Sequence, residues 1–227
     1  MIHLTGKIYL IGIINICINL NVLRYQSEVF KGRSGMKAVK VVRDPTIIKI
    51  LADLVRKEIL RLTAIKPLTE TQLAEKVLLT KPSMSHHLRT LLKAGLIKIT
   101  KTRVGPHGIL EKYYEPIAKL FIEDWEKVPP ELKRYFLHSH MERVRGMLSV
   151  FYLIAENQGQ KIEIRSEEVE RLAQEIAKRV AIVAEKYEDM ETDIDRETLL
   201  IKIYSETLKM MITEIKWKDF FPKIINC

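Results

Sequence analysis

The sequence predicts a mainly α-helical protein with one small β-hairpin. Three observations support this fold class: capped helical stretches follow residue 43, a basic pair of β-branched segments comes next, and long helical patterns fill the C-terminal half. Of the 227 residues, 47% are hydrophobic and 30% are charged. This is an ordinary globular composition, which argues against a disordered or collagen-like chain.

The first predicted helix begins at Asp44-Pro45, because Asp can cap free N–H groups and Pro suits the first turn of a helix. A single apolar stripe is expected to follow, formed by Ile47, Ile48, Leu51, Leu54 and Val55. A second helical stretch is predicted over Glu58–Thr63, and Lys66-Pro67 then interrupts the helical pattern.

A helix-turn-helix is predicted next. The Thr-x-x-Gln capping box at Thr69–Gln72 starts one short helix. After a short turn, Thr80 is a second N-cap, with Pro82 in the first turn of the helix that runs from Lys81 to Ala94. Two capped helices joined by a short turn are typical of this motif.

The helix over Lys81–Ala94 has an apolar face and a basic face, and Gly95 ends it as a C′ residue would. At 100° per residue, one stripe contains Met84, Leu88, Leu91 and Leu92. The opposite face carries His86, Arg89, Thr90 and Lys93, with Ser85 at its edge. The second helix of such a motif fits the major groove of DNA. His87 lies beside the apolar stripe, so we expect it to be partly buried rather than a base reader.

A basic β-hairpin is predicted directly after this helix. Leu96–Arg103 is rich in β-branched residues, Val104–Gly108 contains two glycines and a proline, and Ile109–Tyr114 can return as a second strand. The hairpin is therefore a predicted wing. Because Lys101 and Arg103 lie on a wing strand, we expect them to contact phosphates rather than to serve only as solubilising charges.

Positive charge is concentrated in the same part of the chain. The predicted winged helix-turn-helix, residues 37–116, contains sixteen Lys and Arg against seven Asp and Glu. The helical region after it, residues 117–227, contains eighteen against twenty-one, and the net charge of the chain is +9. A basic head beside a mildly acidic body fits a domain that binds a polyanion, although charge alone equally fits a solubilising bias.

Residues 1–36 form an apolar N-terminal extension with three interpretations. Ile8–Leu23 contains three asparagines and falls short of the roughly 18 uninterrupted apolar residues of a membrane-spanning helix. Three interpretations stay open: a misassigned start with the natural chain beginning near Met36, a soluble packing helix, and a membrane anchor. No signal-peptide cleavage site follows, and Cys17 and Cys227 have no partner at metal-ligand spacing, so we predict a cytoplasmic protein.

The C-terminal region is predicted to be helical. A helical piece containing Leu120, Phe121 and Trp125 leads to Pro129-Pro130. Three helices are expected after it, over Glu131–Glu156, Ser166–Met190 and about Arg196–Ile215. His138 and His140 lie on different faces of the first of these, so a two-histidine metal site is not expected.

The helix over Ser166–Met190 carries a near-heptad stripe. Its apolar positions are Val169, Leu172, Ile176, Val180, Val183, Tyr187 and Met190. We interpret the first six as a dimerisation surface. The alternative is a helix that packs on its own chain.

Four segments between Leu51 and Tyr114 resemble a known family: LADLVRKEILRL, LTETQLAEKV, TKPSMSHHLRTLLKAGLIK and EKYYEP. The pattern Ser-x-His-Leu-x-x-Leu-x-x-Ala-Gly-Leu at Ser85–Leu96 is the most specific of them. They resemble ArsR-type winged-helix transcription regulators, and VKVVRDPTIIKILADLVRKEIL resembles an archaeal branch with extra C-terminal helices.

The resemblance implies a homodimeric, DNA-binding transcription regulator. It places DNA contacts on Lys81, Ser83, Ser85, His86, Arg89, Lys101, Arg103 and His107, to which the outer face of the helix adds Lys93. Metal-sensing members carry a Cys-x-Cys pair in the preceding helix. Here that helix reads TETQLAEKV, so the metal-sensing activity of the family is not expected.

The leading hypothesis is a sequence-specific regulator that binds double-stranded DNA as a homodimer. Phosphate contacts would supply most of the affinity, and the helix around Ser85–Arg89 would supply the choice of sequence. The alternative is a protein-interaction module whose basic face binds an acidic partner. An effector pocket between the C-terminal helices is a further option. The sequence carries no catalytic, phosphate-loop or metal motif, so we predict neither an enzyme nor a cofactor.

Overall fold

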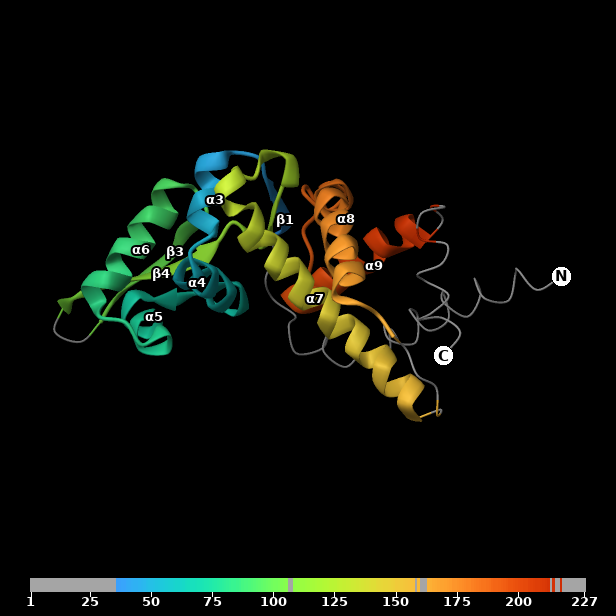
Figure 1. Cartoon of the computed structure of the whole chain (residues 1–227). Coiled ribbons are helices and arrows are strands. Elements are labelled where there is room, and N and C mark those ends of the chain that lie inside the picture. Colours follow the sequence, from blue (N-terminus) through green and yellow to red (C-terminus); the bar gives the residue numbers. More distant parts are fainter. Residues whose placement is uncertain are drawn as a thin grey trace. The chain divides into compact units, whose positions relative to one another are not determined.

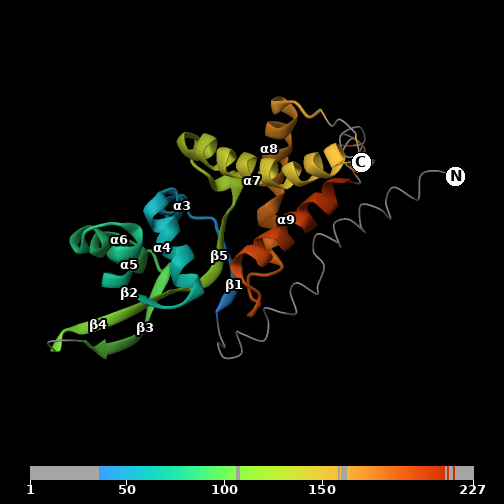
Figure 2. The ribbon, with the colours of Figure 1, turned by 90° about the horizontal axis from the view of Figure 1, so that it is seen from below.

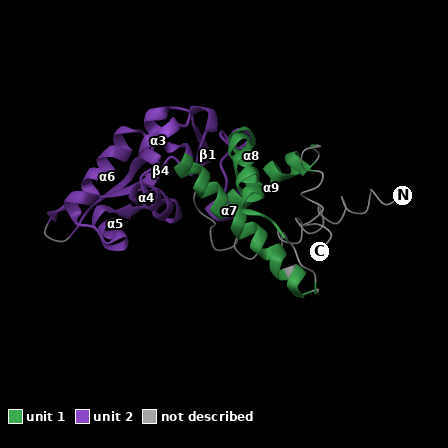
Figure 3. Ribbon diagram, in the orientation of Figure 1, with its two compact units in different colours: residues 1–32, 134–183, 200–227 green, residues 33–133, 184–199 purple. Residues whose placement is uncertain are grey.

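The computed structural model describes residues 36–105, 108–157, 159, 163–212, 214 and 217 (Figure 1). They belong to two compact units, which are described separately (Figure 3). The winged-helix unit contains residues 33–133 and 184–199, and the helical unit includes residues 134–183 and those after 199. The three interpretations of the N-terminal extension concern residues 1–35, which lie outside the described ranges. None of the helices in these ranges combines the length and the apolar character that a membrane span requires.

The winged-helix unit begins with a strand that the sequence pattern did not predict. β1 (Lys37–Val42) pairs in parallel with β5 (Ala118–Glu123). Burial alternates along β5, with Leu120 and Ile122 buried, which is the period of a strand with one covered face. The expectation of a helical piece here is therefore wrong, and only the 3₁₀ turn η2 (Trp125–Lys127) is helical. Because β5 pairs with β1, this unit extends beyond the expected boundary at residue 116.

The apolar stripe expected to be continuous from Ile47 to Val55 is divided between two helices. α3 (Pro45–Leu51) stops, and α4 (Leu54–Ile65) begins behind a second N-cap, Asp53. The Asp53 carboxylate accepts a hydrogen bond from the N–H of Arg56 at 2.9 Å. This break turns Leu54 away from the buried stripe, and the residue is 72% exposed.

The helix-turn-helix consists of α5 (Glu70–Val77) and α6 (Lys81–Lys93). The capping box predicted for α5 is confirmed, since the Gln72 N–H donates to the Thr69 hydroxyl at 3.3 Å and the Thr69 N–H donates to the Gln72 side chain at 3.0 Å. Thr80 caps α6 in the predicted way. Both helix starts are therefore specified by their own flanking residues.

A three-stranded antiparallel sheet completes the winged helix. β3 (Ile97–Val104) and β4 (Leu110–Pro116) form the predicted hairpin, and β2 (Leu68–Thr69) pairs with the other edge of β4. Figure 2 shows this hairpin extending beyond α4, α5 and α6. β2 was not predicted, because two residues are too few to show a period.

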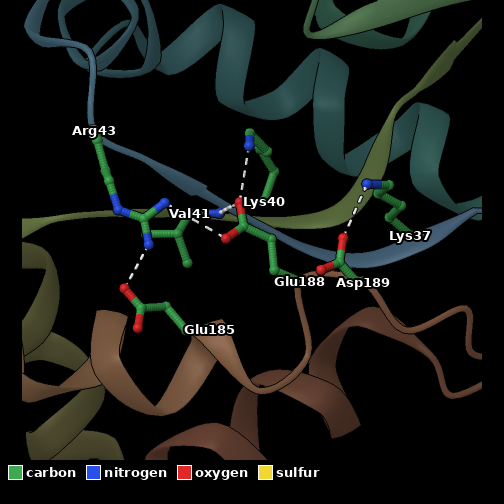
Figure 4. Close-up of polar contacts among 7 residues, drawn as sticks. All are labelled: Lys37, Lys40, Val41, Arg43, Glu185, Glu188 and Asp189. Atoms are coloured by element: carbon green, nitrogen blue, oxygen red, sulfur yellow. Dashed lines mark hydrogen bonds and ion pairs between the residues drawn. The ribbon is translucent and has the colours of Figure 1, made fainter.

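A return segment, residues 184–199, lies beside β1 and neutralises its charge. Figure 4 shows three basic and three acidic side chains facing one another: Lys37, Lys40, Arg43, Glu185, Glu188 and Asp189. Glu188 is at the centre, because its carboxylate accepts hydrogen bonds from Lys40 Nζ at 2.8 Å and from the Val41 N–H at 3.2 Å. The basic residues of β1 therefore have acidic partners within their own unit.

The helical unit is built mainly from α7 (Pro130–Asn157), α8 (Ser166–Glu185) and α9 (Arg196–Ile212). α8 ends before Met190, the expected end of this helix. The predicted dimerisation residues are each at most 7% exposed: Val169, Leu172, Ile176, Val180, Val183 and Tyr187. Such burial matches the alternative of a helix that packs on its own chain. A dimer surface would therefore have to lie elsewhere while the chain keeps this fold.

A buried polar chain joins α7 to α9. Arg143 Nη1 donates to the Tyr204 hydroxyl at 3.0 Å, and that hydroxyl lies 2.6 Å from His140 Nδ1. Because arginine can only donate, the hydroxyl accepts from Arg143 and can donate to the histidine. His140 is buried whereas His138 is exposed, so the two histidines lie on different faces as predicted.

Replacing Glu188 with Gln should make folding less sensitive to acid. Burial raises the pKa of the Glu188 carboxyl, but Lys40, the Val41 N–H and Arg43 outweigh burial and leave the pKa below its ordinary value. Such a group stabilises the fold above its unfolded-state pKa of about 4.3, and its contribution is lost as the pH falls through the lower folded-state pKa.

Denaturant unfolding at about pH 5 and pH 3 measures this loss. Glu188→Gln should lose less stability between the two than the wild-type chain. Glu170→Gln, at an exposed position of α8, is the control and should behave as wild type. Equal losses in all three proteins would contradict the assignment.

Candidate nucleic-acid interface

Three buried side chains determine which way α6 faces. Met84, Leu88 and Leu91 are at most 1% exposed, which confirms the core of the predicted stripe, and Leu92 is half-buried. Burying a side chain of this size stabilises a fold by about 1.5–3 kcal/mol. Rotating α6 about its axis would expose these groups, so the opposite face stays in water.

That outer face carries the predicted contact residues. Lys81, His86, Arg89 and Lys93 are exposed, and Ser83 and Ser85 are half-buried. At 1.5 Å per residue, the basic groups span about 18 Å of the helix. Thr90 belongs to the same face, but its hydroxyl donates to the His86 carbonyl at 3.0 Å and is thus used within the helix.

His87 is held at the edge of the buried stripe, as predicted. Its side chain is 15% exposed, and its Nδ1 lies 3.9 Å from the carboxylate of Asp53, the cap of α4. Burial lowers the pKa of the imidazole. The charge of Asp53 opposes this effect, and those of Arg56 and His86 add to it. The lowered pKa favours the neutral imidazole, and the position of His87 suits packing rather than contact with DNA.

The turn before α6 contains a residue that sequence reasoning missed. Leu78 ends α5 in the left-handed conformation, with φ 57° and ψ 43°, and it is 90% exposed. This conformation costs a residue other than glycine about 1–2 kcal/mol. An exposed leucine just before the N-terminus of α6 is an additional candidate for an apolar contact. Nothing in the sequence marks it, because leucine is not a turn residue.

The wing presents two predicted basic residues on one face. Lys101 and Arg103 are exposed, and their spacing of two places them on the same side of β3. Lys101 lies opposite Tyr113, with its Nζ 5.8 Å from the ring centre, and Arg103 lies opposite Glu111. The aromatic ring thus supports the ammonium group without removing its charge.

Lys112 is a basic wing residue that the sequence pattern does not single out. It is exposed on β4 opposite Thr102, so it lies on the other face of the hairpin from Lys101 and Arg103. Only the strand register places it there. His107, predicted at the wing tip, lies outside the described residues.

Among the described basic residues of this unit, ion pairs are concentrated outside α6 and the wing, although Lys66, Lys76 and Lys127 have none either. Outside α6 and the wing, many pair with an acid: Lys40, Arg43, Lys49, Arg56 and Arg61. In α6 and the described part of the wing, Lys98 alone pairs, with Glu115 at 3.8 Å. The unpaired basic residues there are Lys81, Arg89, Lys93, Lys101, Arg103 and Lys112. Their charge is available to a partner.

The described residues do not bring three His, Cys, Asp or Glu side chains together as a set of metal ligands. The candidate site is instead a surface of exposed cations and hydroxyls on a helix and a hairpin. Such groups bind phosphate oxygens by charge and base edges by hydrogen bonds.

Comparison with known proteins identifies the same motif. A family of helix-turn-helix domains matches residues 51–100, which include α4, α5 and α6. No curated protein sequence matches the chain. Among solved structures, the adhesin competence repressor AdcR of Streptococcus pyogenes aligns at 16% identity over 77% of this chain and 96% of its own, with a TM-score of 0.29. An overlap this low supports no conclusion about function.

The chain thus carries a winged helix-turn-helix followed by further helices. The domain match and the observed fold together indicate a DNA-binding regulator rather than an enzyme. The match to a helix-turn-helix domain does not distinguish the ArsR subtype or its archaeal branch from other families with this motif.

The neutral state of His87 predicts how stability depends on pH. A histidine with a lowered pKa opposes folding once the unfolded chain begins to bind a proton, so stability falls as the pH drops below about 6.5 and stops falling below the folded-state pKa. His87→Gln should therefore lose less stability than wild type between about pH 7.5 and pH 5.5 in denaturant unfolding. His138→Gln, at an exposed position of α7, is the control and should lose as much as wild type. A loss in His87→Gln as large as in wild type would be evidence against a neutral, packed His87.

Proposed function

We propose that this protein is a transcription regulator that binds double-stranded DNA in a sequence-specific way as a homodimer. α6 enters the major groove, and the wing contacts the phosphate backbone beside it. Within α6, the N-terminal residues from Lys81 to His86 and the central Arg89 are placed to meet base edges. Lys93, in the last turn, suits a phosphate.

The observation that carries this proposal is the distribution of unpaired positive charge. The basic residues of β1, α3 and α4 have acidic partners, whereas those on the outer face of α6 and on the wing do not. Leaving these cations unpaired gives an electrostatic surface for a polyanion. The same two elements form the recognition helix and wing of DNA-binding winged helices.

A homodimer is proposed because one recognition helix reads only a short half-site. Two copies related by a twofold axis read two half-sites about one DNA turn apart, roughly 34–36 Å. The added sequence supplies the specificity that a regulator needs. The proposal also includes the narrower assignment to the ArsR type and the regulation of DNA binding by a small-molecule effector.

Removing Arg89 should weaken binding to a specific site far more than binding to random DNA. The Arg89 guanidinium is exposed on the outer face of α6 and can bind guanine O6 and N7 with two hydrogen bonds. Arg89→Ala should cost about 1–3 kcal/mol on a selected site, roughly a 5- to 150-fold rise in Kd. Gel shift or fluorescence anisotropy measures this change. Arg134→Ala, at an exposed position of α7, is the control, and an unchanged Kd for Arg89→Ala would refute the assignment.

The salt dependence of binding to random duplex DNA separates this function from a protein-interaction module. A dimer that neutralises about six phosphates should lose on the order of 10³-fold in affinity between 50 and 200 mM salt. Lys101→Ala and Arg103→Ala should each make the slope of log K against log salt less negative by about two, because each substitution removes one phosphate contact from both subunits. A flat salt dependence, or no binding to DNA at low salt, would favour the protein-interaction module.

A further inference from the structure

The outer face of α7 exposes two large apolar side chains. Val150 is 45% exposed and Leu153 is 61% exposed, and their spacing of three places them on the same side of the helix. The opposite side of α7 is buried through residues such as Val144 and Leu148. α7 therefore has one face that forms the interior of its unit and a second face that presents apolar surface to water.

Two small residues lie on the same exposed face. A side chain added at Gly146 would meet nothing within 4 Å, so packing within the chain does not require glycine at this position. A glycine inside a helix costs about 1 kcal/mol relative to alanine. The Ser149 hydroxyl donates to the Gly146 carbonyl at 2.7 Å, so its polar group is used within the helix. This surface lets another helix approach closely, since the distance between helix axes depends on the side chains at the contact.

We propose that this strip, formed by Gly146, Ser149, Val150 and Leu153, joins two copies of the chain, with the two α7 helices antiparallel. The proposal rests on the proposed function, which includes a homodimer, and it names the surface that forms one. In this arrangement the two α7 helices cross at a point between Val150 and Phe151. Leu153 of one copy then lies opposite the middle of the segment Gly146–Val150 of the second copy. The glycine leaves room for the leucine there.

The charges at the two ends of the strip favour a second copy in this orientation. Arg145 and Glu156 are exposed and eleven residues apart, close to three helical turns, so they lie on the same side of α7. Antiparallel pairing at the same level brings Arg145 opposite Glu156 of the partner subunit, and the twofold axis repeats this pair. Parallel pairing would instead put Arg145 level with Arg145 of the partner subunit, and Glu156 level with its own copy. Arg145 also pairs with Glu142 on its own helix at 2.6 Å, so it would bridge two carboxylates.

The test measures the molar mass of the full chain without DNA, by sedimentation over a range of concentrations. The wild-type chain should be a dimer. Leu153→Ser and Gly146→Gln should each raise the dimer dissociation constant about 100-fold or more, because a substitution acts twice in a symmetric dimer. At concentrations where both proteins are monomeric, Gly146→Gln should also unfold at the same or a higher temperature than wild type, since it replaces glycine with a better helix former in open space. Ile201→Gln, at a 53% exposed apolar position of α9, is the matched control and should remain a dimer.

A charge exchange tests the orientation. Arg145→Glu and Glu156→Arg should each weaken the dimer, because each places like charges opposite one another. The double variant should restore the wild-type dissociation constant. No restoration would overturn the antiparallel arrangement.

Three results would overturn the surface itself. One is a wild-type chain that stays monomeric throughout the concentration range. Another is a dimer that Leu153→Ser and Gly146→Gln both leave intact. If Ile201→Gln alone dissociated that dimer, the contact would lie on α9 instead. The third is a fall in unfolding temperature in both α7 variants without a change in mass, which would mean that the chain itself covers the strip. Since no DNA is present, a failure of DNA binding would not affect these outcomes.

Discussion

The burial of Met84, Leu88 and Leu91 is the constraint on which the proposed DNA-binding surface depends. These three side chains fix the rotation of α6, and the residues between them are thereby placed in water. His86, Arg89 and Lys93 are exposed because of what the other side of the helix buries, and not because of any attraction of their own. Sequence choice can therefore change through the outer residues while the fold is held by the inner ones.

Electrostatics divides the winged-helix unit in a complementary way. The basic residues of β1, and Arg43 directly after it, pair with Glu185, Glu188 and Asp189 of the return segment, and this pairing contributes to the fold rather than to a ligand. The cations of α6 and the wing are mostly left unpaired, which favours the bound state of a polyanion. The basic excess seen in the sequence thus contains both paired and unpaired cations, and the pattern of ion pairs distinguishes them. A total charge could not have done so.

Local signals predicted the helix-turn-helix well, because its helix starts are encoded next to the helices themselves. Thr69 and Thr80 cap α5 and α6 as expected. The missed features depend on distant residues or on a short break: β1 is a strand because β5 lies beside it, and Asp53 ends one apolar stripe and caps the next helix. The stripe of α8 shows a different limit. A heptad-like pattern looks the same whether the partner is another helix of the chain or a second copy, and its burial favours the former. Of the candidate contact residues, the exposure of Arg89 followed from periodicity, whereas the placement of Lys112 needed the strand register.

We propose that the outer face of α6 reads DNA sequence within a symmetric pair of subunits. Selection of bound sequences from a pool of random duplexes by the full chain tests it most directly. We expect enrichment of an inverted repeat whose half-sites lie about one helical turn apart, roughly 10–10.5 base pairs from centre to centre. Recovery of sequences with no shared motif, at an affinity equal to that for random DNA, would contradict it.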